Sequence, residues 1–193
     1  MNIGHLLYDY LIKSGLSETL AAYINMFAFL IIVLILAFFI DFIIRKIIVQ
    51  LFTKFSAKTK TNFDDLLVKN KAPRNIAHII PLIFTLEFTP FIFVDFAYIE
   101  NIVQRGLQVF TILLVLWIVR SLLRTLKDFF KTLPSLKDKP VDSYIQVFMI
   151  FAWVFGILSA IAIITGIEFI QFITTIGAAS AVIILVFKDT IMG

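Results

Sequence analysis

The chain has 193 residues, of which 61% are hydrophobic and only 16% are charged, and 22 of them are Phe. An ordinary soluble domain is about 45–50% apolar and about 25% charged, so this composition excludes a soluble globular protein. The sequence has no Cys and only two His residues, which excludes disulfide scaffolds, thiol nucleophiles and histidine metal clusters. We therefore expect a membrane protein without a cofactor.

Five apolar runs of about 20 residues, separated by basic segments, predict an all-α polytopic membrane protein. A short amphipathic helix in the interface, or alternatively a frayed terminus, is expected ahead of the first run. Arg105, Arg120 and Arg124 flank the third run without the regular repeat of a voltage sensor, so we interpret them as interfacial anchors. The predicted spans cover residues 21–44, 76–98, 102–123, 144–164 and 169–187.

The second predicted span differs from the others because it contains two prolines and two carboxylates: Pro81, Pro90, Glu87 and Asp95. A proline inside a helix removes a backbone hydrogen bond and kinks the axis, so we expect this span to be bent. An ionisable group at bilayer depth is a candidate functional residue. The alternatives are a protonated Glu87 bonded inside the bundle and an Asp95 that reaches the water interface.

The two connections at residues 45–74 and 120–143 are strongly basic, with 14 of the 17 Lys and Arg residues. By the positive-inside rule both connections are cytoplasmic, which puts the N-terminus outside and the C-terminus inside. Their charge suits anionic lipid headgroups, so no nucleic-acid partner is expected. Within the first connection, Asn62 can cap a short helix with Asp64 and Asp65 in its first turn, where carboxylates favour a helix start. A metal or acid/base role for this pair is the alternative.

The fifth span has five small residues in a row, from Gly177 to Ala181, followed by a bulky apolar run. Small residues allow two helices to approach closely. A second face, through Ala178, Ala181 and Leu185, could line a narrow apolar passage if several copies surround an axis, and such a passage can close by dewetting. Ordinary helix packing is the alternative. A turn at Thr165 and Gly166 predicts a hairpin between the last two spans.

The last 22 residues, FITTIGAASAVIILVFKDTIMG, resemble the pore-lining helix of the small-conductance mechanosensitive channel (MscS) family, in its five-helix bacterial branch. NFDDLL, the prolines of the second span and PVDSY are weaker points of similarity. The resemblance implies a homo-heptamer in the bacterial cytoplasmic membrane, opened by tension to release ions and small solutes on hypo-osmotic shock. It also implies a β-rich cytoplasmic domain after Gly193, so we expect the sequence to be a membrane-domain fragment.

Position by position, the resemblance places Gly177 and Ala178 on a packing seam, Ala181 and Leu185 at pore constrictions, and Lys188 and Asp189 at a bend. The chain departs from well-known family members by having Ala181 in place of Leu and Asp189 in place of Gly. Bulky Ile183 and Ile184 replace small residues of the family. The resemblance therefore implies a seal formed by a single ring of Leu185 and a looser helix packing.

Together these features divide the chain into sensor or paddle helices at residues 1–143 and a channel core at residues 144–193. The expected partners are membrane lipids, further copies of the chain and permeating ions. A proton-coupled secondary transporter that uses Glu87 is the alternative function, and a non-conducting membrane anchor is another. No Ser/His, His/Glu or paired-Asp arrangement lies within the spans, so we predict that the chain is not an enzyme.

Overall fold

The computed structural model describes residues 3–56, 62–134 and 140–192. These residues are helical apart from short turns, and they include no strand, which confirms the predicted all-α class for the described part of the chain. The elements are η1 (Ile3–His5), α1 (Leu6–Lys13), α2 (Glu18–Ser56), α3 (Asn62–Lys69), α4 (Ala72–Ala77), α5 (Ile79–Ile92), α6 (Ala97–Thr132), α7 (Val141–Thr165) and α8 (Phe169–Met192).

Five helical segments are long and apolar enough to cross a membrane, as the sequence predicts: α2, α4 with α5, α6, α7 and α8. Several boundaries differ from the prediction. Helices α2 and α6, which contain the first and third predicted spans, have 39 and 36 residues, because they continue into the basic connections. The second predicted span extends too far, since α5 ends at Ile92 and α6 already begins at Ala97.

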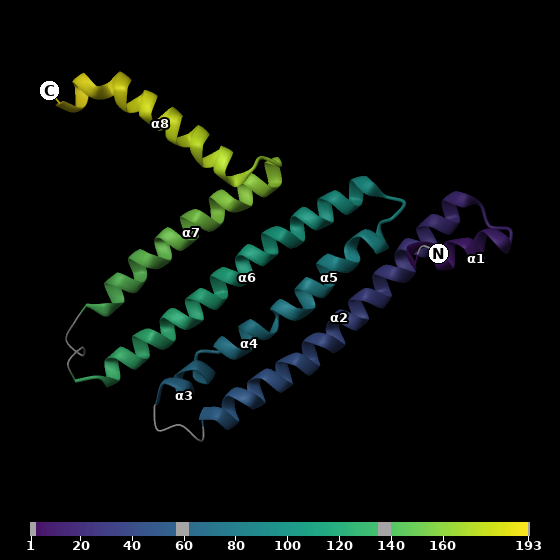
Figure 1. The fold of residues 1–193 in the computed structure, drawn as a ribbon, viewed down its shortest axis with the longest axis horizontal. Helices are drawn as coiled ribbons and strands as arrows, with labels where there is room; N and C mark the ends of the chain where they lie inside the picture. The colour runs from purple at the N-terminus through teal and green to yellow at the C-terminus, as the bar shows by residue number, and fades with distance from the viewer. Residues whose placement is uncertain (1–2, 57–61, 135–139, 193) are drawn as a thin grey trace.

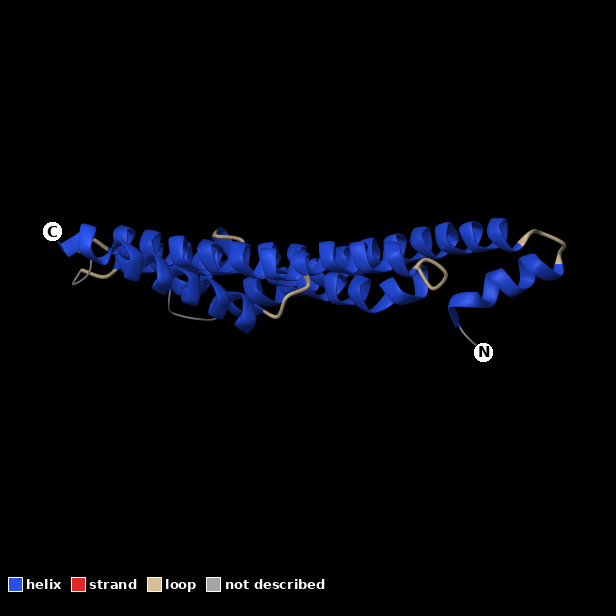
Figure 2. Ribbon diagram, turned by 90° about the horizontal axis from the view of Figure 1, so that it is seen from above, coloured by secondary structure: helices blue, strands red, loops and turns tan. Residues whose placement is uncertain are grey.

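Four long helices lie side by side in chain order, α2, α5, α6 and α7 (Figure 1). Each packs against the next, α2 on α5, α5 on α6 and α6 on α7. Seen from above, these helices form a narrow slab (Figure 2). One open layer buries few residues, and its small apolar core lies between α2 and α5 around Met26, Val33, Ile92 and Phe93.

Most large apolar side chains therefore remain on the surface, such as Phe38 at 67% and Phe55 at 68% exposed. Soluble proteins rarely expose contiguous apolar patches beyond a few hundred Å². The exposed apolar surface along all five long segments needs acyl chains or other protein surfaces to cover it. A membrane environment meets this need, in agreement with the composition.

The N-terminal helix α1 folds back beside the start of α2 (Figure 1). The side-chain amide of Asn25, which is 1% exposed, donates to the carbonyl of Gly4 at 2.7 Å. In return, the Asn25 amide oxygen accepts from the backbone N–H of Tyr8 at 3.2 Å. The predicted short helix is thus present and attached to α2, and the alternative of a frayed terminus is wrong.

Helices α6 and α7 approach closely at Gly156. A Cβ atom built at this glycine would lie 2.8 Å from the Cδ1 atom of Leu116, which is 5% exposed. In contrast, a Cβ atom at Gly106 on α6 would meet nothing within 4 Å. Gly156 is therefore required for helix contact, whereas Gly106 is not.

Gly156→Leu is expected to destabilise the chain, because overpacking a filled contact costs about 1–3 kcal/mol. The matched substitution Gly106→Leu should not destabilise the chain, since the side chain points into open space and leucine favours a helix over glycine by about 0.5–1 kcal/mol. Thermal unfolding of the purified protein in detergent measures both changes. Equal melting temperatures for the two variants would contradict the close contact between α6 and α7.

Candidate functional site

Helix α8 carries all of the residues that the sequence analysis assigns to the pore and the bend. Gly177, Ala178 and Ala181 are exposed, and Leu185 is 72% exposed. Lys188 and Asp189 lie within the last turns of the same helix. Within the described part of the chain these pore and seam residues are exposed, so their assigned roles remain predictions.

The position of α8 explains this exposure. It leaves the layer at an angle to α7 (Figure 1) and packs against no helix other than α7 among the described elements. No residue in its 18-residue apolar window is buried. Apart from its contact with α7, this apolar helix of 24 residues therefore has no packing partner among the described elements.

Three hydroxyl side chains of α8 are satisfied within the helix itself. The hydroxyls of Thr174, Thr175 and Ser180 each donate to the backbone carbonyl four residues earlier, at 2.8 Å. With these hydroxyls bonded, α8 presents an apolar surface between Phe172 and Phe187. Such a helix can pack closely against small-residue faces or line a passage that excludes water.

The predicted hairpin turn between α7 and α8 is present, but the two helices diverge beyond it and do not pack along their length as antiparallel neighbours (Figure 1). Gly166 ends α7 with φ of 74°, a left-handed conformation that favours glycine. Arg105 on α6 donates from its Nη1 atom to the carbonyl of Ile164 at 2.8 Å. Arg105 therefore fixes the end of α7 to α6, in addition to any anchoring role at the interface.

A cleft of about 560 Å³ lies beside this hairpin, between α6, α7 and the start of α8. Its polar lining includes Glu100, Gln104, Arg105 and Glu168. The cleft therefore combines polar and apolar side chains at the end of the layer where the short connections lie. No residue in its lining belongs to the predicted pore face of α8.

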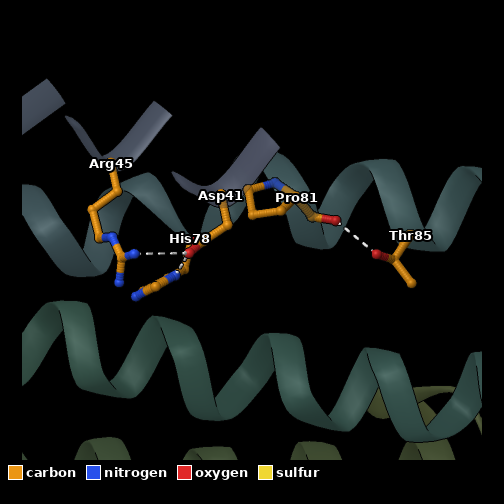
Figure 3. A network of polar contacts seen from close by, with 5 residues as sticks. All are labelled: Asp41, Arg45, His78, Pro81 and Thr85. Atoms are coloured by element: carbon orange, nitrogen blue, oxygen red, sulfur yellow. Dashed lines mark hydrogen bonds and ion pairs between the residues drawn. The ribbon is translucent and has the colours of Figure 1, made fainter. Parts of the chain in front are cut away.

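A second polar cluster, which the sequence analysis missed, joins α2 to the second span (Figure 3). The Nδ1 atom of His78 lies 2.5 Å from Oδ1 of Asp41, and Nη2 of Arg45 lies 3.9 Å from Oδ2 of the same carboxylate. These three side chains are about one-fifth to one-third exposed. The only sequence signal for this cluster was an aspartate inside an otherwise uncharged run.

Pro81 accounts for the position of His78. Because proline has no amide hydrogen, the carbonyl four residues earlier, in Ala77, loses its helical partner. The helix is interrupted at His78, between α4 and α5, which agrees with the predicted bend. Pro90, by contrast, lies inside α5 without ending it. The hydroxyl of Thr85 donates to the carbonyl of Pro81 at 2.8 Å (Figure 3).

The carboxylates of the second predicted span lie in two different environments. Glu87 is exposed on α5, so the expectation of a Glu87 bonded inside the bundle is wrong for the chain by itself. Asp95 lies in the turn between α5 and α6, 3.2 Å from Nε2 of His5. Partial burial, followed by the nearby Glu18, Asp95 and Asp9 carboxylates, raises the pKa of Tyr8 in the same region.

The paired aspartates of the first connection lie at the start of α3, as predicted. The hydroxyl of Ser56, at the end of α2, donates to Oδ1 of Asp65. Among the described residues, no group of three or more His, Cys, Asp or Glu side chains could hold a metal ion. A structural role at the start of the helix therefore accounts for this pair.

A comparison of the chain with protein-family models, curated proteins and solved structures gives no match in any of the three. The geometry of α8 and of the polar clusters thus provides the structural basis for a functional proposal.

Proposed function

We propose that this chain is the membrane domain of a mechanosensitive ion channel. Tension in the bacterial cytoplasmic membrane opens it and releases ions and small solutes on hypo-osmotic shock. Several copies, seven by the family resemblance, surround an axis that is lined by α8. The observation that supports this proposal most strongly is that α8 is long and apolar, and that no residue in its 18-residue apolar window is buried.

The arrangement of the other helices suits a tension sensor. The layer of α2, α5, α6 and α7 is one helix thick, so its apolar side chains can contact lipid over a large area. Charged residues lie at the ends of these helices, where Lys127 and Lys131 pair with Asp142 between α6 and α7 at 3.1 and 3.4 Å. The N-terminus is outside and both basic connections are cytoplasmic in the proposed orientation.

Opening is a shift between two populations. A closed state with a narrow Leu185 ring competes with an open state of larger in-plane area. Tension favours the open state by the product of tension and area change, because only a difference between the states can do mechanical work. The outward splay of α8 in Figure 1 allows this helix to move without disrupting the packed layer.

Single-channel recording under graded suction tests the proposal. Membrane patches that contain the full chain are expected to show stepwise currents whose open probability rises with suction. The host strain lacks mechanosensitive channels of its own. Patches from this strain without the chain provide the control. Silence up to patch rupture would overturn the channel proposal.

The transporter alternative depends on Glu87, and the same preparation tests it. Its signature is a pH-dependent flux that Glu87→Gln abolishes and that does not respond to suction. Glu87 is exposed on α5 and is absent from the lining of the cleft between α6, α7 and the start of α8. The geometry therefore favours the channel, for which we expect Glu87→Gln to leave suction-activated currents in place.

A further inference from the structure

The two histidines of the chain have a common arrangement, because each is paired with an aspartate from a different segment. His5 of η1 lies 3.2 Å from Asp95 in the turn between α5 and α6. His78, at the break between α4 and α5, lies 2.5 Å from Asp41 on α2. The two pairs lie near opposite ends of the α2 and α5 contact. Only the second joins two membrane-spanning segments directly.

The surroundings of the second pair are apolar. Asp41 and His78 line one end of a cavity of about 400 Å³ whose other walls come from α5 and α6. From α6 these walls are Leu107, Phe110, Leu114 and Trp117. Electrostatic attraction is stronger in such surroundings than in water. A change of charge at this position therefore acts directly on the contact between α2 and the second span, and solvent screens part of it because the two side chains are 34% and 22% exposed.

Few charged groups face the pair. On α2 the neighbouring cation is Arg45, which also lines a cleft of about 400 Å³ with Lys46 and with Arg74 of α4. The cavity walls from α5 and α6 include no charged side chain. The acidic residues of α3 lie near Ser56, which is 15 residues along α2 from Asp41 and therefore about 22 Å away.

We propose that His78 and Asp41 form a proton-responsive tie between α2 and the break in the second span. Neutral imidazole can offer the carboxylate a hydrogen bond only. Imidazolium adds the attraction of opposite charges, and histidine is the side chain whose charge changes most readily near neutral pH. Acidification on the side of the basic connections therefore holds α2 and the α4–α5 break together, and alkalinisation loosens them.

The role of Arg45 fits this arrangement. At 3.9 Å its guanidinium partly neutralises Asp41, so the carboxylate is not left unpaired when His78 is neutral. The helices then remain neighbours but are held less tightly. Two arrangements of similar free energy, biased by one proton, are the requirement for a pH switch.

Pulsed electron paramagnetic resonance can measure the tie directly. The chain has no Cys, so two introduced cysteines at Phe39 on α2 and Ile83 on α5 carry the only spin labels. Both positions are exposed, at 55% and 52%. From pH 8 to pH 5.5 we expect the ratio of the short-distance to the long-distance population to rise about tenfold, which corresponds to about 1.4 kcal/mol.

Three variants of the labelled full chain decide the outcome. His78→Gln and Asp41→Asn should each remove the pH response, while the matched control His5→Gln, which breaks the other histidine pair, should retain it. If one of the first two variants fails to fold, the other still tests the tie. A pH response that survives in His78→Gln or Asp41→Asn, one that is lost in His5→Gln, or a wild-type chain without any response would overturn the proposal.

Recording from patches adds a functional measurement, and this part alone depends on the proposed channel. A tightened tie resists the rearrangement of the layer, so the opening threshold should be higher at cytoplasmic pH 5.5 than at pH 8. His78→Gln should have the same threshold at both values. Absence of any current would reject the channel proposal and leave the spin-label result as the test of the tie.

Discussion

Leu185→Ser is expected to lower the tension threshold markedly and to produce openings in patches without applied suction. In the proposed closed state, the Leu185 side chains meet around the axis and keep the constriction dry. Withdrawing one Leu side chain from water contributes about 1.5–3 kcal/mol, and a ring multiplies this by the number of copies. A serine ring admits water and removes most of that contribution. The threshold in patches under graded suction is the measurement.

Ile183→Ser is the matched control for this prediction. Two positions that are two residues apart on a helix lie about 160° apart around its axis, so Ile183 faces away from Leu185. Both side chains are exposed in the chain, at 57% and 72%, and the substitution is chemically similar. We expect Ile183→Ser not to lower the threshold. An equal decrease in both variants, or an unchanged or higher threshold in Leu185→Ser, would reject Leu185 as the seal.

The long apolar runs and the hairpin could be predicted from the sequence because they depend on local properties. A run of about 20 apolar residues can satisfy its backbone in a membrane only as a helix. Gly166 can adopt the positive φ that a tight turn requires. The short helix α3 was also predictable, since Asp64 and Asp65 lie in its first turn.

The contacts between helices could not be predicted in the same way. Asp41 and His78 are 37 residues apart, and their contact depends on which faces of α2 and the second span meet. The break at Pro81 was expected, but its consequence, a histidine placed against α2, is a property of the packing. Likewise, no sequence pattern indicates that Arg105 bonds to the end of α7.

The environment of Glu87 also differs from the one that the sequence suggested. A carboxylate within an apolar run suggested a buried, bonded group, yet the side chain is exposed on α5. Glu87 is exposed in a single protomer, as are the proposed pore-face residues Ala178, Ala181 and Leu185 of α8. Surfaces that are covered in an assembly cannot be distinguished from lipid-facing surfaces by apolar composition, because both are apolar. Variants that separate the two are therefore the most informative.

On α8, Gly177→Leu distinguishes a surface that another copy covers from a surface that faces lipid. A Cβ atom at Gly177 would meet nothing within 4 Å in the chain, so the protomer itself should tolerate the substitution with an unchanged helix content. If Gly177 lies on a seam between copies, overpacking costs about 1–3 kcal/mol per interface, roughly a 5- to 150-fold loss in association constant. Oligomer mass in detergent, measured by light scattering against protein concentration, reports this loss.

Gly106→Leu provides the control, because this glycine also faces open space but lies on α6, outside the proposed seam. We expect Gly106→Leu to assemble like the wild type and Gly177→Leu to dissociate at higher protein concentration. Equal assembly of both variants would place Gly177 toward lipid rather than toward another copy. In that case α8 could not line a pore with the seam proposed here, and the exposed apolar face of α8 would have to be assigned to the membrane.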